Sequence, residues 1–226
     1  MEMKKESNML TEEEPKYTVK DINGIKIGMT CYTYETETGK EGRKALNGIM
    51  LASEATNLIN SFSYERLDAF YTDLKGQLDG MKAQGAEATV VYIHWGDEYR
   101  LTANKKQIEI AQQLCNLGVD VIVGGHAHVV EPIDLLTSET DPDHKTVCLY
   151  SMGNAVSNQR KERASIKTGH TEDGVLFSIT FAKYSDGTHG EASVTFIKLG
   201  AFQNNNKIKK VILPETVTEL DGCAFL

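Results

Sequence analysis

The chain has 226 residues, which is enough for one domain with a sizeable core or for one domain with an appendage. Its hydrophobic content of 40% and charged content of 25% are ordinary for a soluble globular protein. The formal net charge of −8 disfavours nucleic acid and anionic membranes as partners. No apolar run approaches the length of a transmembrane helix, so we expect no membrane span in this chain.

The start of the chain predicts a flexible lead-in, a β-hairpin and a loop. Residues 1–16 are polar and acidic and lack the apolar stretch of a signal peptide, so we expect no export by this chain alone. Residues 17–22 and 25–32 alternate between apolar and polar side chains around Asn23-Gly24, which predicts a hairpin with a tight turn. Residues 35–48 combine Gly and Asn with charged side chains and are expected to form a loop.

The middle of the chain predicts helices and buried strands in alternation. Apolar side chains recur at helical spacing up to Gly85, in a helix that begins near Ser53 or, after a break, near Ser63. The β-branched runs 88–93 and 119–123 are typical of buried parallel strands. With a second helix between them, these strands predict a right-handed βαβ unit.

The second helix, residues 104–117, is predicted to end at Gly118 and to bury one apolar face. We assign to that face Ile108, Ala111, Leu114 and Cys115. Residues 146–151 predict a further strand, and residues 175–184 and 192–199 predict a late hairpin.

The cysteines predict buried free thiols, with disulfides or a zinc knuckle as the alternatives, because no two of them have C-x-x-C spacing. They are Cys31, Cys115, Cys148 and Cys223.

The last residues, 201–226, differ in character from the rest. The Ala-Phe pair at 201–202 recurs at 224–225, a period of 23 residues that lies within the range of leucine-rich repeats. The segment resembles one unit of the BspA-type leucine-rich repeats of bacterial surface proteins. A single repeat cannot bury its own apolar face. The alternative interpretation is an ordinary terminal strand and turn of the main domain.

Three of the six histidines lie at the ends of the two predicted parallel strands. His94 ends the first strand, and Gly124-Gly125-His126-Ala127-His128 follows the second. The carboxyl ends of parallel strands meet at one sheet edge, where open α/β sheets bind ligands. Histidines at i and i+2 of an extended backbone point to the same side. The trio His94, His126 and His128 is therefore a candidate site for a divalent transition metal, although His94 taken alone is explained as well by a structural role.

Two more polar residues are candidates at this edge. Glu98 follows His94 by four residues and could orient a histidine or contact a substrate, with a solvated loop carboxylate as the alternative. Asn154 ends a strand at the same edge, and its alternative is a tight-turn residue beside Gly153. Trp95, the only tryptophan, is expected to pack beneath the site.

These segments resemble a known family. Val91-x-x-His94 and Gly125-His126-x-His128 are similar to the last two motifs of the calcineurin-like metallophosphoesterase superfamily. A more specific resemblance, over residues 17–199, is to the bacterial capsule-synthesis family (CapA/PgsA, poly-γ-glutamate). It rests on residues 23–28, His94-Trp95-Gly96-Asp97-Glu98-Tyr99, residues 118–129 and Tyr150-Ser151-Met152-Gly153-Asn154, with Ala127 in place of the family's usual proline.

The resemblance implies an α/β fold. This would be the C-terminal portion of a metallophosphoesterase-like α/β sandwich, a mixed sheet with flanking helices, followed by the short repeat-like tail. It implies three parts: the lead-in (1–16), a capsule-synthesis domain lacking its N-terminal half (17–200), and the single repeat-like unit (201–226).

The resemblance also implies paired divalent metals, Mn, Fe or Zn, in the parent protein. The superfamily holds them with additional Asp-x-His, Gly-Asp and Asn-His motifs, and this chain contains none of these apart from Gly96-Asp97. One metal would keep only His128, and the other would keep His94 and His126. We therefore expect weak metal binding or none by this chain, and we assign no catalytic residue.

Three hypotheses for function remain open. The first is a fragment of a capsule-synthesis-type protein of the cell envelope or exterior, inactive alone, whose parent acts on poly-γ-glutamate or a related anionic polymer. The second is a surface interaction protein whose terminal repeat begins a binding array. The third is a truncated reading frame without a selected function. A missing half would leave open strand edges, which favour homo-oligomers.

Overall fold

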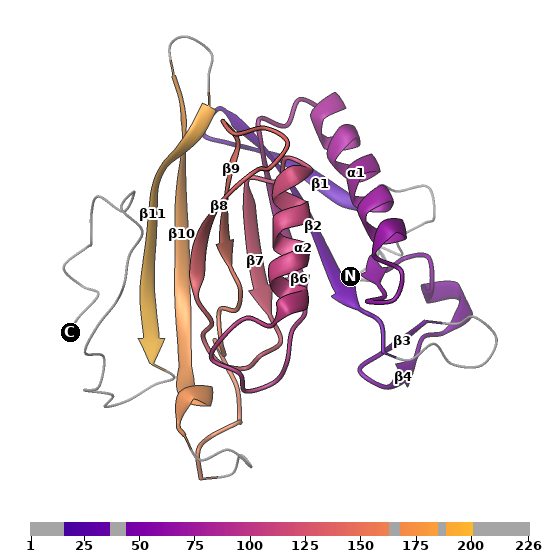
Figure 1. Ribbon diagram of the computed structural model, residues 1–226, viewed down its shortest axis with the longest axis vertical. Helices are drawn as coiled ribbons and strands as arrows, with labels where there is room; N and C mark the ends of the chain where they lie inside the picture. Colours follow the sequence, from indigo (N-terminus) through magenta and orange to yellow (C-terminus); the bar gives the residue numbers. More distant parts are fainter. Residues whose placement is uncertain (1–15, 37–43, 163–167, 185–188, 201–226) are drawn as a thin grey trace, which may run out of the picture.

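The structure, a computed structural model, describes residues 16–36, 44–162, 168–184 and 189–200. Its centre is a seven-stranded sheet, most of whose strands run parallel (Figure 1). In spatial order the strands are β1 (Tyr17–Ile22), β2 (Ile25–Tyr34), β6 (Ala88–His94), β7 (Val121–Gly125), β9 (Lys145–Leu149) and β8 (Ile133–Thr137), with β5 (Ser61–Phe62) beside the end of β2. Strands β2, β6, β7 and β9 are parallel neighbours, and β1 and β8 are antiparallel edges.

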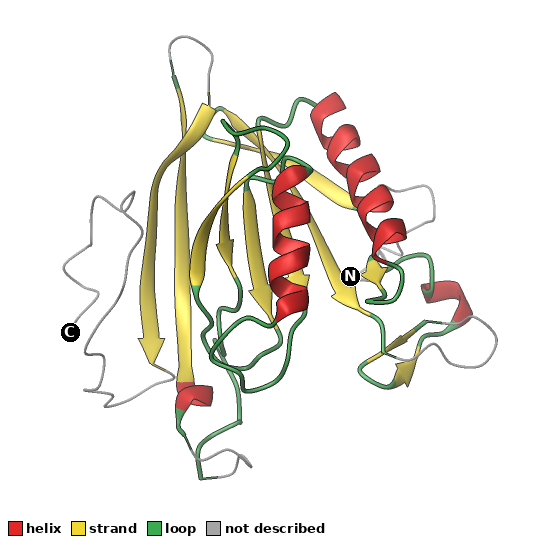
Figure 2. Ribbon diagram, in the orientation of Figure 1, coloured by secondary structure: helices red, strands yellow, loops and turns green. Residues whose placement is uncertain are grey.

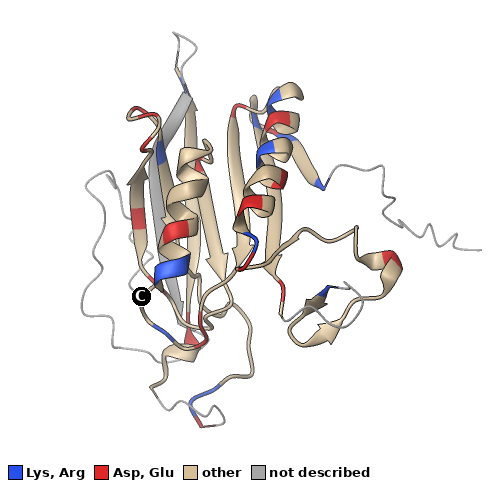
Figure 3. Cartoon of the chain, turned by 45° about the vertical axis from the view of Figure 1, so that its right-hand side comes forward, with Lys and Arg blue, Asp and Glu red and all other residues tan. Residues whose placement is uncertain are grey.

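The remaining elements surround this sheet (Figure 2). They are the helices α1 (Leu67–Ala83) and α2 (Lys105–Asn116), the short strands β3 (Ala45–Leu46) and β4 (Ile49–Met50), two 3-10 turns (Ser53–Ala55 and His170–Glu172), and the hairpin β10 (Asp173–Lys183) and β11 (His189–Gly200). The mixed sheet with flanking helices that the sequence predicts is confirmed. Charged residues lie mainly on the helices and peripheral loops, and the central strands carry few (Figure 3).

The first hairpin forms as predicted. Strands β1 and β2 pair antiparallel around Asn23 and Gly24, whose φ angles of 53° and 88° are both positive, as a type I′ turn requires. The first long helix begins later than either predicted start, at Leu67, and the residues near Ser53 form only a 3-10 turn.

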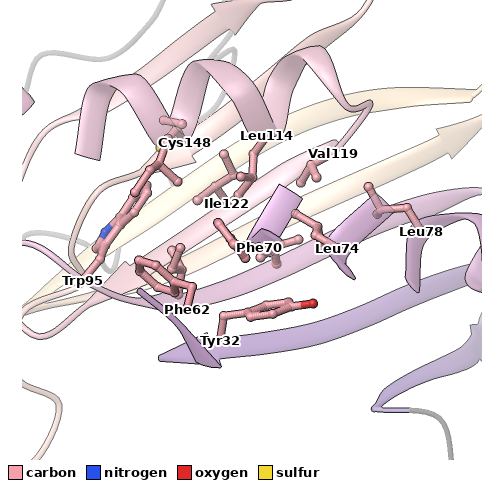
Figure 4. Packing of buried hydrophobic residues seen from close by; sticks show 14 of the residues in the cluster. Tyr32, Phe62, Phe70, Leu74, Leu78, Trp95, Leu114, Val119, Ile122 and Cys148 are labelled. Atoms are coloured by element: carbon pink, nitrogen blue, oxygen red, sulfur yellow. The ribbon is translucent and has the colours of Figure 1, made fainter. Parts of the chain in front are cut away.

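The main hydrophobic core lies between one face of the sheet and the two helices (Figure 4). Its fully or almost fully buried members include Phe70, Leu74 and Met81 from α1, Ile110 and Leu114 from α2, and Val91, Ile93 and Ile122 from the strands. Helix α1 lies close to β2 because position 28 is glycine: a Cβ there would lie 2.7 Å from the Met81 Sδ atom. This packing fixes the relative positions of β2, β6 and β7, whose ends carry the candidate residues.

The apolar face predicted for α2 was partly wrong. Ile108 is 51% exposed, and the buried positions are instead Gln107, Ile110, Ala111, Leu114 and Cys115. The helix has an Asn104–Gln107 capping box, which fixes its start, and the buried Gln107 then bonds to another buried polar side chain. Because the buried position is the polar Gln107, the apolar pattern of the sequence pointed to its neighbour Ile108 instead.

The late hairpin is confirmed and faces the side of the sheet opposite the helices. A cavity of about 540 Å³ separates it from the sheet, lined mostly by apolar residues that include Ile27, Val90, Val123, Phe177 and Ile179. The start of β10 is tied to the sheet edge through Met152, whose carbonyl accepts a hydrogen bond from the Val175 backbone. Strand β8 was not predicted.

Cys115 and Cys148 are buried free thiols, as expected, but Cys31 is exposed. Cys31 lies on the sheet face turned away from the helices, where it is not covered. Residues 1–15 of the predicted lead-in, the repeat-like tail (201–226) and Cys223 fall outside the described residues. No helix in the described part of the chain is long and apolar enough to cross a membrane.

Candidate functional site

The three candidate histidines come together at the carboxyl-end edge of the sheet. His94 is the last residue of β6 and pairs in register with Gly125, the last residue of β7. The ring centroids of His94 and His126 are 4.6 Å apart, and those of His126 and His128 are 6.2 Å apart. We call His94, His126 and His128 the histidine cluster.

The backbone that carries the last two histidines is not extended, contrary to the sequence-based expectation. His126 has a φ of 100° and His128 a φ of 58°, in the left-handed region that costs a non-glycine residue about 1–3 kcal/mol. Between them, Ala127 is fully buried, and its carbonyl accepts a hydrogen bond from the Tyr99 backbone. Anchoring this alanine turns the chain, so the two rings diverge by 52° rather than lying side by side.

A tight contact beneath the cluster holds the end of β7. A Cβ atom at position 124 would lie 1.9 Å from the Tyr150 carbonyl oxygen, so only glycine fits there. The same carbonyl accepts a hydrogen bond from Trp95 Nε1 at 2.9 Å. Trp95 is fully buried beneath the site, as predicted.

Tyr34 is a member of the site that sequence reasoning missed. It is the last residue of β2, and its neighbour Thr33 pairs with His94. The Tyr34 hydroxyl lies 3.2 Å from His126 Nε2, and its ring stacks on His94 with centroids 5.9 Å apart and planes 14° apart. Burial, followed by the charges of Glu98 and Asp97, raises the pKa of Tyr34. Its position at the end of a strand beside the predicted His94 strand was the available signal.

Asn154 is 9% exposed and orients His128. Its Nδ2 donates to the main-chain oxygens of His128, at 3.2 Å, and Thr171, at 2.9 Å, which fixes Oδ1 as the atom that faces His128 Nδ1 at 2.9 Å. Because Oδ1 can only accept, His128 Nδ1 carries the proton. The Nε2 atom of His128 is then left with its lone pair.

Glu98 faces that lone pair. Its Oε1 atom lies 3.9 Å from His128 Nε2, and its side chain is 48% exposed. Two acceptors face each other at this distance, an arrangement that a proton or a cation would satisfy. The Glu98 side chain thus lies near His128 without a hydrogen bond to it, and the roles considered for Glu98 stay predictions.

The electrostatic setting favours the neutral form of His94 and His126. Burial lowers the pKa of His126, an effect that His128 adds to and the negative charge of Glu98 opposes. Partial burial is the main cause that lowers the pKa of His94. The charges that His126 and His128 would carry lower it further. Neutral imidazole is the form that binds metals.

The donor atoms therefore suit a transition metal, but their arrangement does not fit a paired-metal centre. Within the described residues, no group of three His, Cys, Asp or Glu is placed to hold an ion. His126 Nε2 is already bonded to Tyr34 and His128 Nδ1 to Asn154. His128 Nε2 and Glu98 Oε1, 3.9 Å apart, form an open pair of acceptors.

A chain of polar side chains runs from the exposed Asp97, on the loop that also carries Glu98, to the buried Glu131. Asp97 accepts a hydrogen bond from Asn104 Nδ2 at 2.8 Å, and Asn104 caps α2 together with Gln107. Gln107 Nε2 donates to Glu131 Oε2 at 2.7 Å, and Glu131 is 2% exposed. Burial raises the pKa of Glu131 to about 7, an effect that the Gln107 hydrogen bond opposes. Sequence reasoning did not single out Glu131.

The fold and the site define an α/β protein with a histidine cluster at the carboxyl-end edge of a mixed sheet. The chain belongs to the family described as "Bacterial capsule synthesis protein PGA_cap", whose model matches residues 8–159. It is 28% identical over 150 residues to the PGA biosynthesis protein CapA of Bacillus subtilis (strain 168), and the aligned region covers 66% of this chain and 33% of that protein. It is 33% identical over 78 residues to the capsule biosynthesis protein CapA of Bacillus anthracis, which covers 34% of this chain and 17% of that protein.

The chain thus spans about a third of the length of the B. subtilis relative. Among solved structures, the sulfate thiohydrolase SoxB of Thermus thermophilus in complex with glycerol is similar with a TM-score of 0.46 and 16% identity, covering 83% of this chain and 25% of that one. A hypothetical protein from the same species, T. thermophilus, is similar with a TM-score of 0.43 and 11% identity, covering 81% of this chain and 61% of that one.

Proposed function

We propose that this chain is the later part of a capsule-synthesis-type protein of the bacterial cell envelope, and that it is catalytically inactive alone. Family membership and the relative named a PGA biosynthesis protein support the capsule role. The single observation that carries the inactivity is the arrangement of the histidine cluster: three imidazoles lie close together, yet among the described residues they are not placed to hold one ion.

The chemistry of phosphoester cleavage supports this proposal. A two-metal hydrolase needs both ions to hold a hydroxide and to stabilise the leaving oxygen. The cluster offers one nitrogen–oxygen pair, His128 Nε2 and Glu98 Oε1, and this pair alone binds an ion only weakly. We therefore propose weak binding of Mn, Fe or Zn by this chain, or none, and no substantial phosphodiesterase activity.

The polymer partner is proposed for the parent protein rather than for this chain. Poly-γ-glutamate or a related anionic polymer is the partner that the name of the B. subtilis relative suggests. The chain itself carries a net charge of −8, which repels a polyanion in the absence of a bound cation.

Equilibrium dialysis of the purified chain against Mn²⁺, Fe²⁺ and Zn²⁺, with hydrolysis of bis(4-nitrophenyl) phosphate measured alongside, tests this proposal. We expect weak metal uptake that His128→Ala abolishes, and no metal-dependent hydrolysis. The matched control is His144→Ala, because His144 lies beyond the opposite edge and bonds the Val119 carbonyl. Tight uptake, or hydrolysis that depends on the histidine cluster, would show that the site is complete.

A further inference from the structure

We propose that Tyr34 closes the histidine cluster to metal ions by occupying Nε2 of His126, the central imidazole. The inference rests on the proposed function, because it explains why a cluster of three histidines binds metal only weakly. It concerns a residue outside the predicted ligand set, on a strand that contributes no histidine.

The position of Tyr34 is set by the sheet and not by chance surface packing. Seven residue pairs hold β2 parallel to β6, ending with Thr33 opposite His94, so Tyr34 must emerge beside the cluster. Its ring stacks on His94, meets His126 edge to face at 5.1 Å, and packs on Tyr64 at 5.8 Å. Tyr64 is itself fixed, since its hydroxyl accepts a hydrogen bond from the Gly96 backbone at 3.1 Å.

The hydrogen bond and a metal bond compete for the same atom. An imidazole nitrogen has one site in the ring plane, which holds either a proton, a hydrogen bond or a metal. Nε2 of His126 is taken by Tyr34 and Nδ1 of His128 by Asn154, whereas His128 Nε2 lies 3.9 Å from Glu98 Oε1 and forms an open pair with it. Removing the Tyr34 hydroxyl would add the middle nitrogen to this pair.

The test is Tyr34→Phe in the full 226-residue chain, which keeps the ring between His94 and Tyr64 and removes only the hydroxyl. Zn²⁺ binding is measured by isothermal titration calorimetry, and Co²⁺ absorption reports the coordination. We expect Y34F to bind Zn²⁺ about two- to tenfold more tightly than the parent, the equivalent of one net hydrogen bond. The Co²⁺ spectrum should gain intensity as the ion acquires a further imidazole ligand.

The matched control is Tyr71→Phe, the same chemical change at a buried hydroxyl on α1 that has no hydrogen-bond partner within the described part of the chain. Its Zn²⁺ affinity should equal that of the parent chain. Adding His126→Ala to Y34F should abolish the gain; a gain that persists would place the metal elsewhere and overturn the proposal.

Equal or weaker Zn²⁺ binding by folded Y34F would also overturn the proposal, and weaker binding would indicate that Tyr34 is itself a ligand. Neither result touches the proposed function, which fails instead if the parent chain binds metal tightly or hydrolyses phosphodiesters. No uptake by either protein would refute the role of Tyr34 while leaving the chain inactive as proposed.

Discussion

Glu131 makes the stability of this protein depend on pH in an unusual direction. Its carboxyl group is 2% exposed, one oxygen accepts from Gln107 and the other has no partner among the described residues. Burial raises its pKa from the ordinary 4.5 to about 7. The folded state therefore holds the proton more tightly than the unfolded state, and this contribution to stability is fully present below pH 4.5 and is lost as pH rises through about 7.

The size of the effect follows from the shift. A pKa that rises from 4.5 to about 7 corresponds to roughly 3–4 kcal/mol of folding free energy at most, since each pKa unit is worth about 1.4 kcal/mol. Glu131→Gln removes the titration and keeps an amide oxygen that can accept from Gln107. The variant also buries an amide NH₂ without a partner, so the prediction concerns the slope of stability against pH and not its absolute level.

Urea unfolding at a series of pH values between 4 and 8, on parent and variant together, measures that slope. We expect the unfolding free energy of the parent to fall relative to E131Q by about 2–3 kcal/mol across this range. Glu109→Gln, on the exposed face of α2 and paired with Lys106, should track the parent. Parallel curves for parent and E131Q would refute the reasoning, because they would mean that the buried carboxyl titrates normally.

Other predictions follow from the site and the sheet. Gly124→Ala should destabilise the fold by about 3 kcal/mol or more, because a Cβ would lie 1.9 Å from the Tyr150 carbonyl oxygen. The control is Gly125→Ala, whose Cβ meets nothing within 4 Å. Thermal melts compare the two variants, and equal losses of stability would contradict the contact. Asn154→Ala should cost about 1–3 kcal/mol through its lost buried hydrogen bonds, and chemical denaturation showing no loss would exclude that role. The chain should self-associate with rising concentration in sedimentation experiments, and Tyr92→Thr, at a 44% exposed position on the sheet, should weaken association; a strictly monomeric parent would remove the basis of this expectation.

Local patterns predicted the elements whose signals lie within a few residues. The Asn23-Gly24 hairpin and the β-branched runs that form β6 and β7 needed only periodicity and turn chemistry. Strand β8 was missed because it follows Pro132 directly and its apolar positions are only half-buried. Residues whose role depends on distant partners could not be found this way: Gln107 faces inward only because Glu131 lies opposite it.

The candidate site divides in the same manner. Strand-end positions placed His94, His126 and His128 at one edge correctly, because parallel register follows from the order of the strands. Their relative orientation depends on the positive φ angles at His126 and His128, which the sequence pattern does not encode. The Tyr34 contact arises from pairing between β2 and β6, whose partners are 61 residues apart along the chain. Whether these residues bind a metal stays a prediction.

The hydrogen bonds of Asn154 also determine which parts of the molecule open together. Its side chain forms hydrogen bonds with the imidazole and the main-chain carbonyl of His128 and with the Thr171 carbonyl. Its backbone amide donates to the carbonyl of Asp173, the first residue of β10. The histidine edge and the root of the late hairpin therefore share one set of bonds. In amide hydrogen exchange they should behave as one cooperative unit: an excursion that lifts β10 from the sheet also frees the imidazole of His128 to rotate.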